Sequence, residues 1–277
     1  MDLQTEIERN VAAALAEDVG PGDWTAMLTP ENQTSRATVI CRQSAVLCGH
    51  AWFELCFKKL DPDVTVTWKC KEGEKLEGGA PVCELTGKTR ALLTGERTGL
   101  NFLQTLSAVA TKTRRYVEAV AGTRAAIVDI RKTLPGLRLA QKYAVRVGGG
   151  VNHRLGLYDG VLIKENHIAA AGGVTAALTE ARRVAPQGVW IQIEVETLQQ
   201  LEEALRAGAT MILLDNMTLE QMREAVAITA GRAQLEASGG ITLETVRPIA
   251  ETGVDRISIG SLTKDIDAVD LSMRLDG

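Results

Sequence analysis

From residue 126 to its end, the chain alternates short apolar runs with stretches of helical periodicity. Strands that alternate with helices predict a parallel sheet, and this many units in succession favour a β/α barrel. Each run ends on a charged, polar or glycine residue; these residues are Arg131, Lys164, Glu194, Asp215, Ser238 and Gly260. Active sites of parallel barrels lie at the carboxyl ends of the strands, so the pattern predicts where the chemistry is.

The first part of the chain has a different pattern. A helix is predicted near the start, ending before Gly20, from apolar residues at helical spacing: Leu3, Ile7, Val11 and Leu15. Residues 36–87 are rich in β-forming residues, and a long helical stretch follows from Thr89 to Val120. Later, the sequences Thr197-x-x-Gln200 and Thr218-x-x-Gln221 predict capped helix starts.

These patterns predict two domains. Residues 1–108 are expected to form an N-terminal α/β sandwich domain, and residues 109–265 an open, TIM-like parallel β/α barrel of about six strands. The C-terminal segment 266–277 is expected to return and pack on the first domain.

Composition narrows the choice of partners. The 277 residues carry a net charge of -4, which gives no sign of a nucleic-acid or anionic-membrane partner. The acidic N-terminus does not resemble a signal peptide, and no apolar run approaches the roughly 18 residues that span a bilayer. We therefore expect a cytoplasmic protein. The five cysteines show no Cys-x-x-Cys pair and are interpreted as small hydrophobic residues or inert thiols.

Two glycine-containing turns predict a phosphate site. Ser238-Gly239-Gly240 and Gly260-Ser261 end the last two predicted strands, and each leads towards a helix. Glycine lets backbone N–H groups approach phosphate oxygens, and helix N-termini favour negative charge. The alternative is that the glycines only make tight turns.

Cations gather at the first strand ends, namely Arg131, Lys132, His153, Arg154 and Lys164. Clustered cations repel one another, so in an acidic protein they predict a ligand with several negative charges. They could instead be unrelated surface charges. Glu194 and Asp215 follow on the next two strands, where carboxylates suit hydroxyl recognition, Mg²⁺ binding or stabilisation of a developing carbocation. They could also simply neutralise Lys132 and Lys164.

In this order the motifs resemble the quinolinate phosphoribosyltransferase family, also called carboxylating nicotinate-nucleotide pyrophosphorylases. The resemblance covers nearly the whole chain and is carried by Gly95–Ser107, Arg131–Arg138, Gly148–Leu157, Leu162–His167, Ile193–Glu196, Leu214–Asn216, Ser238–Gly240 and Ile257–Gly260. It implies an Mg²⁺-dependent reaction of quinolinate with phosphoribosyl pyrophosphate, which gives nicotinate mononucleotide, pyrophosphate and CO2 in de novo NAD synthesis.

The resemblance also implies residue roles. Arg131, His153 and Arg154 would hold the quinolinate carboxylates with Lys164 nearby, and Lys132 and Lys164 would face phosphoribosyl pyrophosphate. Glu194 and Asp215 would bind ribose hydroxyls or Mg²⁺, directly or through water or substrate, and with the two lysines would form the catalytic set. The 5′-phosphate would lie on two turns made of Ser238, Gly239, Gly240, Ile259, Gly260 and Ser261.

Family members form head-to-tail homodimers, in which the residue matching Arg97 would reach the neighbouring subunit's site. The sequence leaves assembly beyond the dimer open. It also leaves open a molybdenum-transport-associated paralogue with another substrate, a Schiff-base aldolase that uses Lys164, and a non-catalytic phosphate-ligand binding module.

One position departs from the family pattern. Where the family usually has Asp-Thr-Arg-Lys-Thr, this chain has Ile130 in place of the first threonine. Ile130→Thr restores a hydroxyl at the edge of the site, and a hydrogen bond of about 0.5–1.5 kcal/mol predicts a roughly two- to tenfold gain in kcat/KM for quinolinate. Steady-state kinetics measure this, and an unchanged kcat/KM would contradict it.

Overall fold

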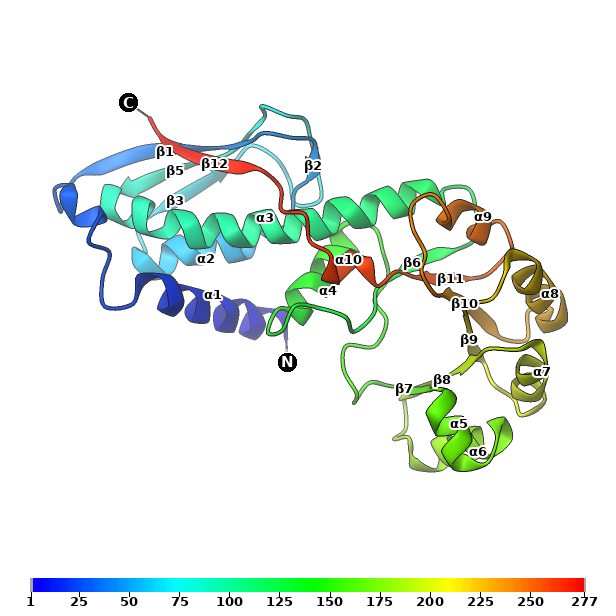
Figure 1. The fold of residues 1–277 in the computed structure, drawn as a ribbon. Coiled ribbons are helices and arrows are strands. Elements are labelled where there is room, and N and C mark those ends of the chain that lie inside the picture. The colour runs from blue at the N-terminus through cyan, green and yellow to red at the C-terminus, as the bar shows by residue number, and fades with distance from the viewer. Residues whose placement is uncertain (1, 277) are drawn as a thin grey trace. The chain divides into compact units, whose positions relative to one another are not determined.

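A computed structural model describes residues 2–276; Met1 and Gly277, which the predicted domain ranges include, lie outside the described part. The chain divides into two compact units (Figure 1). The first contains the residues up to Arg114, then Thr133–Gly149 and the residues from Leu262 onward; the second contains Arg115–Lys132 and Gly150–Ser261. The segment Thr133–Gly149 thus packs with the first unit, although it follows the first barrel strand.

The first unit is built on an antiparallel sheet of order β12-β1-β5-β3. Its strands are β1 (Thr34–Cys41), β3 (Thr65–Trp68), β5 (Pro81–Lys88) and β12 (Leu271–Leu275), with β2 (Ala45–Val46) and β4 (Lys75–Leu76) forming a small separate pair. Its helical elements are α1 (Leu3–Val19), η1 (Ala26–Leu28), α2 (His50–Leu60), α4 (Arg138–Val147), and most of α3 (Thr89–Ala119) and of α10 (Ser261–Lys264). In Figure 1, α3 and α2 lie along one side of this sheet.

Strand β1 shows why this sheet forms. Its burial alternates, with Ala37, Val39 and Cys41 fully buried and the residues between them more exposed. This is the period of a strand with one face on a core. β12 pairs with the edge of β1 that does not pair with β5, and Val39 lies opposite Met273. The end of the chain therefore completes the sheet that its beginning starts.

Helix α2 was not predicted from the sequence, because residues 36–87 were interpreted as β-rich. It buries Trp52, Phe53, Cys56 and Phe57, which are spaced i, i+1, i+4 and i+5. That is a helical face, and the β-forming tendency of its aromatic residues concealed it. Gly95 and Gly99 of α3 face its aromatic rings closely enough that a β-carbon at Gly95 would lie 2.7 Å from Phe57.

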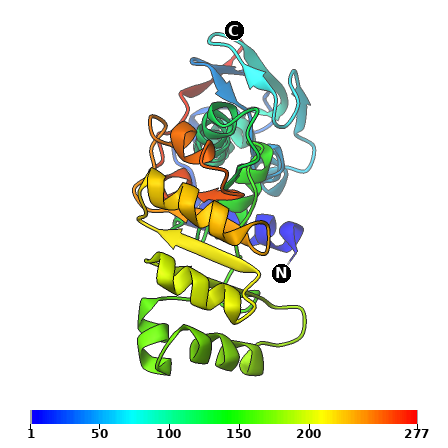
Figure 2. The same ribbon diagram turned by 90° about the vertical axis from the view of Figure 1, so that its right-hand side faces the viewer.

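The second unit confirms the predicted barrel strands. Six parallel strands run in the order β6-β11-β10-β9-β8-β7, so β6 and β7 are the two edges of an open arrangement. Their bounds are β6 Ala126–Val128, β7 Gly160–Ile163, β8 Trp190–Val195, β9 Met211–Asp215, β10 Gln234–Ser238 and β11 Arg256–Ser258. The helices between them are α5 (Glu165–Ala171), α6 (Val174–Val184), α7 (Leu198–Arg206), α8 (Leu219–Thr229) and α9 (Val246–Ala250). Figure 2 shows α8, α7 and the α5–α6 pair stacked in sequence order.

Local predictions for these helices are confirmed. Thr197 and Thr218 each accept a hydrogen bond from the backbone N–H of the glutamine three residues later. The side-chain oxygen of that glutamine accepts from the backbone N–H of the threonine.

All five cysteines are buried and free, and burial raises the pKa of Cys56 to about 12, so its thiolate is strongly disfavoured. Among the described residues, no helix is both long and apolar enough to cross a membrane.

Leu103→Ala should destabilise the first unit. Leu103 is fully buried on α3, and removing such a side chain leaves a cavity that costs roughly 2–5 kcal/mol. Asn101→Ala is the matched control, because Asn101 lies exposed on the same helix and should change stability by less than about 0.5 kcal/mol. Denaturant unfolding measures both, and equal effects would contradict this account of the core.

Candidate active site

Side-chain alternation along the parallel strands brings the predicted residues to one face of the second unit's sheet. Glu194 is paired in register with Leu213, Leu213 with Glu236, and Glu236 with Arg256, so these four form one row. Asp215 and Ser238 form the pair that lies two residues beyond Leu213 and Glu236, towards the carboxyl ends of the strands. Successive side chains point to opposite faces, so residues two apart share a face. The two rows therefore belong to the same surface.

Lys164 and Glu194 meet at this face. Lys164 directly follows β7, Glu194 is the fifth residue of β8, and Nζ lies 3.2 Å from Oε2. The Glu194 side chain is mostly buried, whereas about half of the Lys164 side chain is exposed. Burial raises the pKa of Glu194, while the Lys164 ammonium lowers it and the nearby Asp215 charge raises it. This contact is the one expected from the alternative in which Glu194 neutralises Lys164.

Asp215 is held by the residue that follows it. Asn216 Nδ2 donates to Asp215 Oδ2 at 2.8 Å, and the Asn216 backbone N–H donates to Ser238 O at 3.0 Å. Asn216 adopts a left-handed conformation with φ 53°, which asparagine tolerates better than most residues. Gly239 packs directly on the Asn216 side chain, where a β-carbon would overlap it. The predicted glycine turn and the predicted carboxylate are thus one local structure.

The first and last strands also meet. A β-carbon on Gly260 would lie 3.0 Å from Ile130 Cδ1 and 3.6 Å from Lys132 Cδ, so these predicted site residues are neighbours. Ile259 differs, because its side chain is 1% exposed and its N–H donates to Val128 O within the sheet. Neither the side chain nor the N–H of Ile259 is therefore available at the strand ends. Any phosphate contact of this turn must be made by Gly260 and Ser261.

Two arginines lie close enough to influence each other. The pKa of the Arg154 guanidinium is lowered, first by burial and then by the neighbouring positive charge of Arg131, while Asp159 opposes the shift. Arg154 Nη1 also donates to Gly160 O at 3.1 Å, which anchors the side chain at the start of β7. Two cations this close repel each other, and an anion bound beside them would relieve that repulsion.

His153 is placed deeper than the sequence suggested. It is 6% exposed, and its Nε2 lies 2.8 Å from Gln192 Oε1 and 3.8 Å from Glu236 Oε1. Gln192 Nε2 donates to Glu236 Oε2 at 3.2 Å, and Arg256 Nε donates to the same oxygen at 3.0 Å. The His153 and Trp190 rings are nearly perpendicular, with their centroids 4.9 Å apart. Gln192, Glu236 and Arg256 were not predicted as site residues.

A period-two signal marks these missed residues. Gln192 precedes Glu194 by two positions, and Glu236 precedes Ser238 by two, so each lies on the same strand face as a predicted site residue. Asp129 is a further missed residue: its Oδ1 accepts from the His153 backbone N–H at 2.8 Å, and its Oδ2 accepts from Asn152 at 2.6 Å. Asp129 therefore fixes the segment that carries His153 and Arg154.

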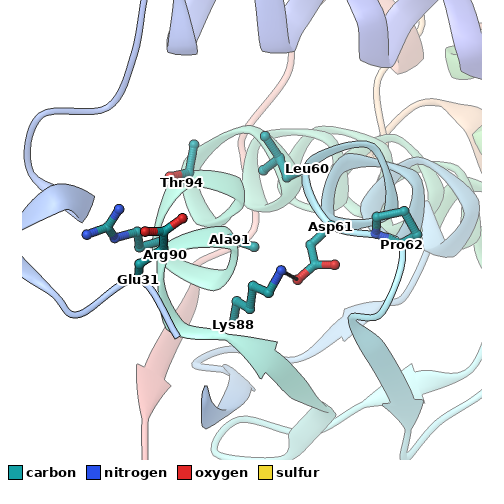
Figure 3. Close-up of a pocket in the computed structure, with 8 residues that line it drawn as sticks. All are labelled: Glu31, Leu60, Asp61, Pro62, Lys88, Arg90, Ala91 and Thr94. Atoms are coloured by element: carbon teal, nitrogen blue, oxygen red, sulfur yellow. Dashed lines mark ion pairs between the residues drawn. The ribbon is translucent and has the colours of Figure 1, made fainter. Parts of the chain in front are cut away.

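Every predicted site residue except Arg97 belongs to the second unit. Arg97 is exposed on α3 in the first unit. The first unit also contains a cavity of about 420 Å³, lined by Glu31, Leu60, Asp61, Pro62, Lys88, Arg90, Ala91 and Thr94 (Figure 3). Within it Lys88 points towards Asp61, with 3.9 Å between Nζ and Oδ2. No predicted site residue lines this cavity.

The acidic pair suits a metal that is bound mainly by its substrate. No group of three or more His, Cys, Asp or Glu residues within residues 2–276 is arranged to hold a metal ion. Glu194 and Asp215 provide two carboxylates that are close enough to repel. Mg²⁺ is commonly held by one or two carboxylates together with substrate phosphates and water, and the pair fits that arrangement.

Comparison with known proteins bears on this arrangement. The family description "Quinolinate phosphoribosyl transferase, N-terminal domain" matches residues 23–107, and the corresponding C-terminal domain matches residues 109–274. The chain belongs to the quinolinate phosphoribosyltransferase family. The recognised family resemblance is thus confirmed over both predicted halves of the chain.

Relatives of this quinolinate phosphoribosyltransferase family member support the assignment. A probable carboxylating nicotinate-nucleotide pyrophosphorylase of Bacillus subtilis is 43% identical over 257 residues, covering 93% of this chain and 89% of that protein. A decarboxylating quinolinate phosphoribosyltransferase of Nicotiana tabacum is 38% identical and covers 96% and 81%. The solved nicotinate-nucleotide pyrophosphorylase of Francisella tularensis superposes with a TM-score of 0.96 at 42% identity, covering 100% and 98%.

Gly239→Ala should destabilise the second unit and disturb Asp215. The glycine has φ 114°, and an alanine there would combine a strained backbone with overlap on Asn216, at a cost of about 1–3 kcal/mol. Gly231→Ala is the control, because φ is 77° but nothing lies within 4 Å of the added carbon. Urea unfolding compares them; equal losses would show that the contact with Asn216 contributes nothing.

Proposed function

We propose that this protein transfers a phosphoribosyl group from phosphoribosyl pyrophosphate to quinolinate and decarboxylates the product to nicotinate mononucleotide. The observation that carries the proposal is one sheet face that combines the Lys164–Glu194 pair, the Asp215–Asn216–Gly239 turn and Gly260 with Lys132 as its neighbour. Relatives that are 43% and 38% identical bear the names of this activity. Both substrates are strongly anionic, which matches the cations around this face.

Quinolinate carries two adjacent carboxylates, and Arg131 and Arg154 are the groups proposed to bind them. A guanidinium offers paired donors that match a planar carboxylate. The lowered pKa of Arg154 records the unfavourable burial and repulsion that the cations experience together. A dianion between them would remove that repulsion, so binding energy is available from the arrangement of the protein itself.

Ribosyl transfer would follow at the carboxyl ends of β8 and β9. The pyridine nitrogen attacks the anomeric carbon as the bond to pyrophosphate breaks, and positive charge develops on the ribose ring. Glu194 and Asp215, at the carboxyl ends of these strands, would stabilise that charge and accept hydrogen bonds from ribose hydroxyls. Lys132 and Lys164 would stabilise the departing pyrophosphate, and the turns at Ser238–Gly240 and Gly260–Ser261 would hold the 5′-phosphate.

Decarboxylation then needs little from the protein. The bond between ring carbon 2 and its carboxylate breaks, and the electron pair remains on carbon 2 beside the cationic ring nitrogen. CO2 leaves, and a proton adds to carbon 2. When bound, Mg²⁺ would neutralise pyrophosphate charge, with Glu194 and Asp215 as the residues that hold it, directly or through water.

The aldolase alternative gains no support from the site. A Schiff-base lysine must present a neutral amine, whereas Lys164 is paired with the Glu194 carboxylate at 3.2 Å.

We expect the activity to reside in the cytoplasm.

Incubation with quinolinate, phosphoribosyl pyrophosphate and Mg²⁺ tests the proposal. The expected products are nicotinate mononucleotide and CO2, detected by chromatography and by release of label from the 2-carboxylate. Glu194→Gln should lose most activity while binding quinolinate, because it is assigned to the ribosyl step. Quinolinate binding by the parent protein without either product would contradict the proposed reaction.

Arg97 is proposed to complete the site of a partner subunit in a homodimer. Arg97→Ala and Lys164→Ala proteins should each be inactive alone. Random exchange of their subunits should restore about a quarter of the parent activity, because half the dimers would then hold one intact site. Lys164→Ala mixed with Glu194→Gln is the control and should recover nothing, since both residues belong to one unit. Absence of recovery in the first mixture would count against a shared site.

A further inference from the structure

A buried polar chain runs beneath the candidate site. It connects His153 through Gln192 to Glu236 and Arg256, with contacts of 2.8, 3.2 and 3.0 Å. Gln192 and Glu236 are each 1% exposed. Buried polar groups at this depth are costly unless they are bonded, so such a chain in an otherwise apolar core calls for an explanation.

This buried chain of hydrogen bonds determines which nitrogen of His153 carries a proton. A carboxylate only accepts, so the Gln192 amide nitrogen must face Glu236 and its oxygen must face His153. That oxygen accepts from Nε2, which therefore bears the hydrogen. The neutral ring consequently has the Nε2–H tautomer, and any contact of the ring with a ligand must be made by Nδ1.

Glu236 has a second relation to the ring. Its Oε2 is occupied by Gln192 and Arg256, while its Oε1 is buried, has no hydrogen-bond partner among the described residues, and lies 3.8 Å from His153 Nε2. A buried carboxylate oxygen directed at an imidazole favours the charged form of that ring. The carboxylate is therefore arranged to stabilise an imidazolium.

Other charges around His153 come from each neighbouring element. Arg256 on β11 neutralises part of Glu236, Asp129 after β6 accepts from the backbone of His153, and Arg154 follows it in the chain with Arg131 nearby. Glu236 therefore favours an imidazolium, and its pairing with Arg256 moderates that effect.

We propose that Glu236, acting through Gln192, is a positioning residue that fixes the tautomer of His153 and stabilises its protonation at Nδ1 when a carboxylate of quinolinate binds. A neutral Nδ1 would present a lone pair to that carboxylate, and the two would repel. A protonated Nδ1 donates to it. This inference rests on the proposed function, and it adds that quinolinate binding takes up a proton from solution.

Proton uptake is measured by calorimetry of quinolinate binding in two buffers with different ionisation enthalpies. At a pH where the free ring is neutral and the bound ring is charged, the parent protein should take up close to one proton per site, and the KM for quinolinate should rise as the pH rises. At a lower pH, where the free ring is already charged, uptake should vanish. In Glu236→Gln, uptake should be lost and the KM for quinolinate should rise about tenfold or more, as expected for a lost charged hydrogen bond.

Two further variants separate positioning from folding. Gln192→Leu removes the acceptor of the Nε2–H group but leaves the Glu236–Arg256 pair intact, so it should fold and show a reduced uptake, because Glu236 then acts on the ring only across 3.8 Å. Glu224→Gln removes an exposed charge from α8 in the same unit and should behave as the parent protein. The KM for phosphoribosyl pyrophosphate should change less than roughly threefold in all three, because its proposed contacts lie elsewhere.

Nitrogen NMR of histidine-labelled protein gives a readout independent of turnover. The chain has three histidines, and His153→Gln identifies the relevant signals. The free protein should show His153 protonated at Nε2, and quinolinate should move Nδ1 to the protonated range in the parent but not in Glu236→Gln. Turnover by the parent protein with no proton uptake and an unchanged Nδ1 signal would overturn this inference while leaving the proposed reaction intact. Absence of turnover despite uptake would reject the reaction instead.

Discussion

The register of six parallel strands is the constraint on which the site depends. Because Glu194, Leu213, Glu236 and Arg256 are locked opposite one another by backbone hydrogen bonds, their side chains have one direction in common. A shift of one residue in any strand would turn its contribution to the opposite face. On β8 and β10 a residue assigned to the candidate site, Glu194 or Ser238, follows by two positions a buried polar residue on the same face, Gln192 or Glu236.

Electrostatics differ between the candidate site and the buried residues beneath it. The positive charge of Arg131 lowers the pKa of Arg154, and Lys164 is paired with Glu194. The repulsion between the two arginines is unfavourable in isolation, and an anion bound between them would relieve it. Below them, Glu236 provides fixed negative charge in the core, which is stabilised by Arg256. The candidate site thus combines repulsion between two cations with a buried carboxylate that is already paired.

Much of this could be predicted from the sequence because strand ends and caps are local features. The six apolar runs gave the strands, and Thr197 and Thr218 gave the starts of α7 and α8. Helix α2 was missed because aromatic residues favour both strands and buried helical faces. The depth of His153 and its contact with Gln192 were also missed, since they link residues 39 positions apart. No local pattern encodes such a pairing, although period-two spacing places Gln192 on the right face.

The pairing of β12 with β1 has a consequence for the order of events during synthesis. The first unit lacks its last strand until residues Leu271–Leu275 have left the ribosome, whereas all six strands of the second unit emerge earlier. Until then β1 is an open sheet edge, with the unsatisfied backbone groups that invite wrong pairing between nascent chains. The unit that begins the chain is thus the last to be completed.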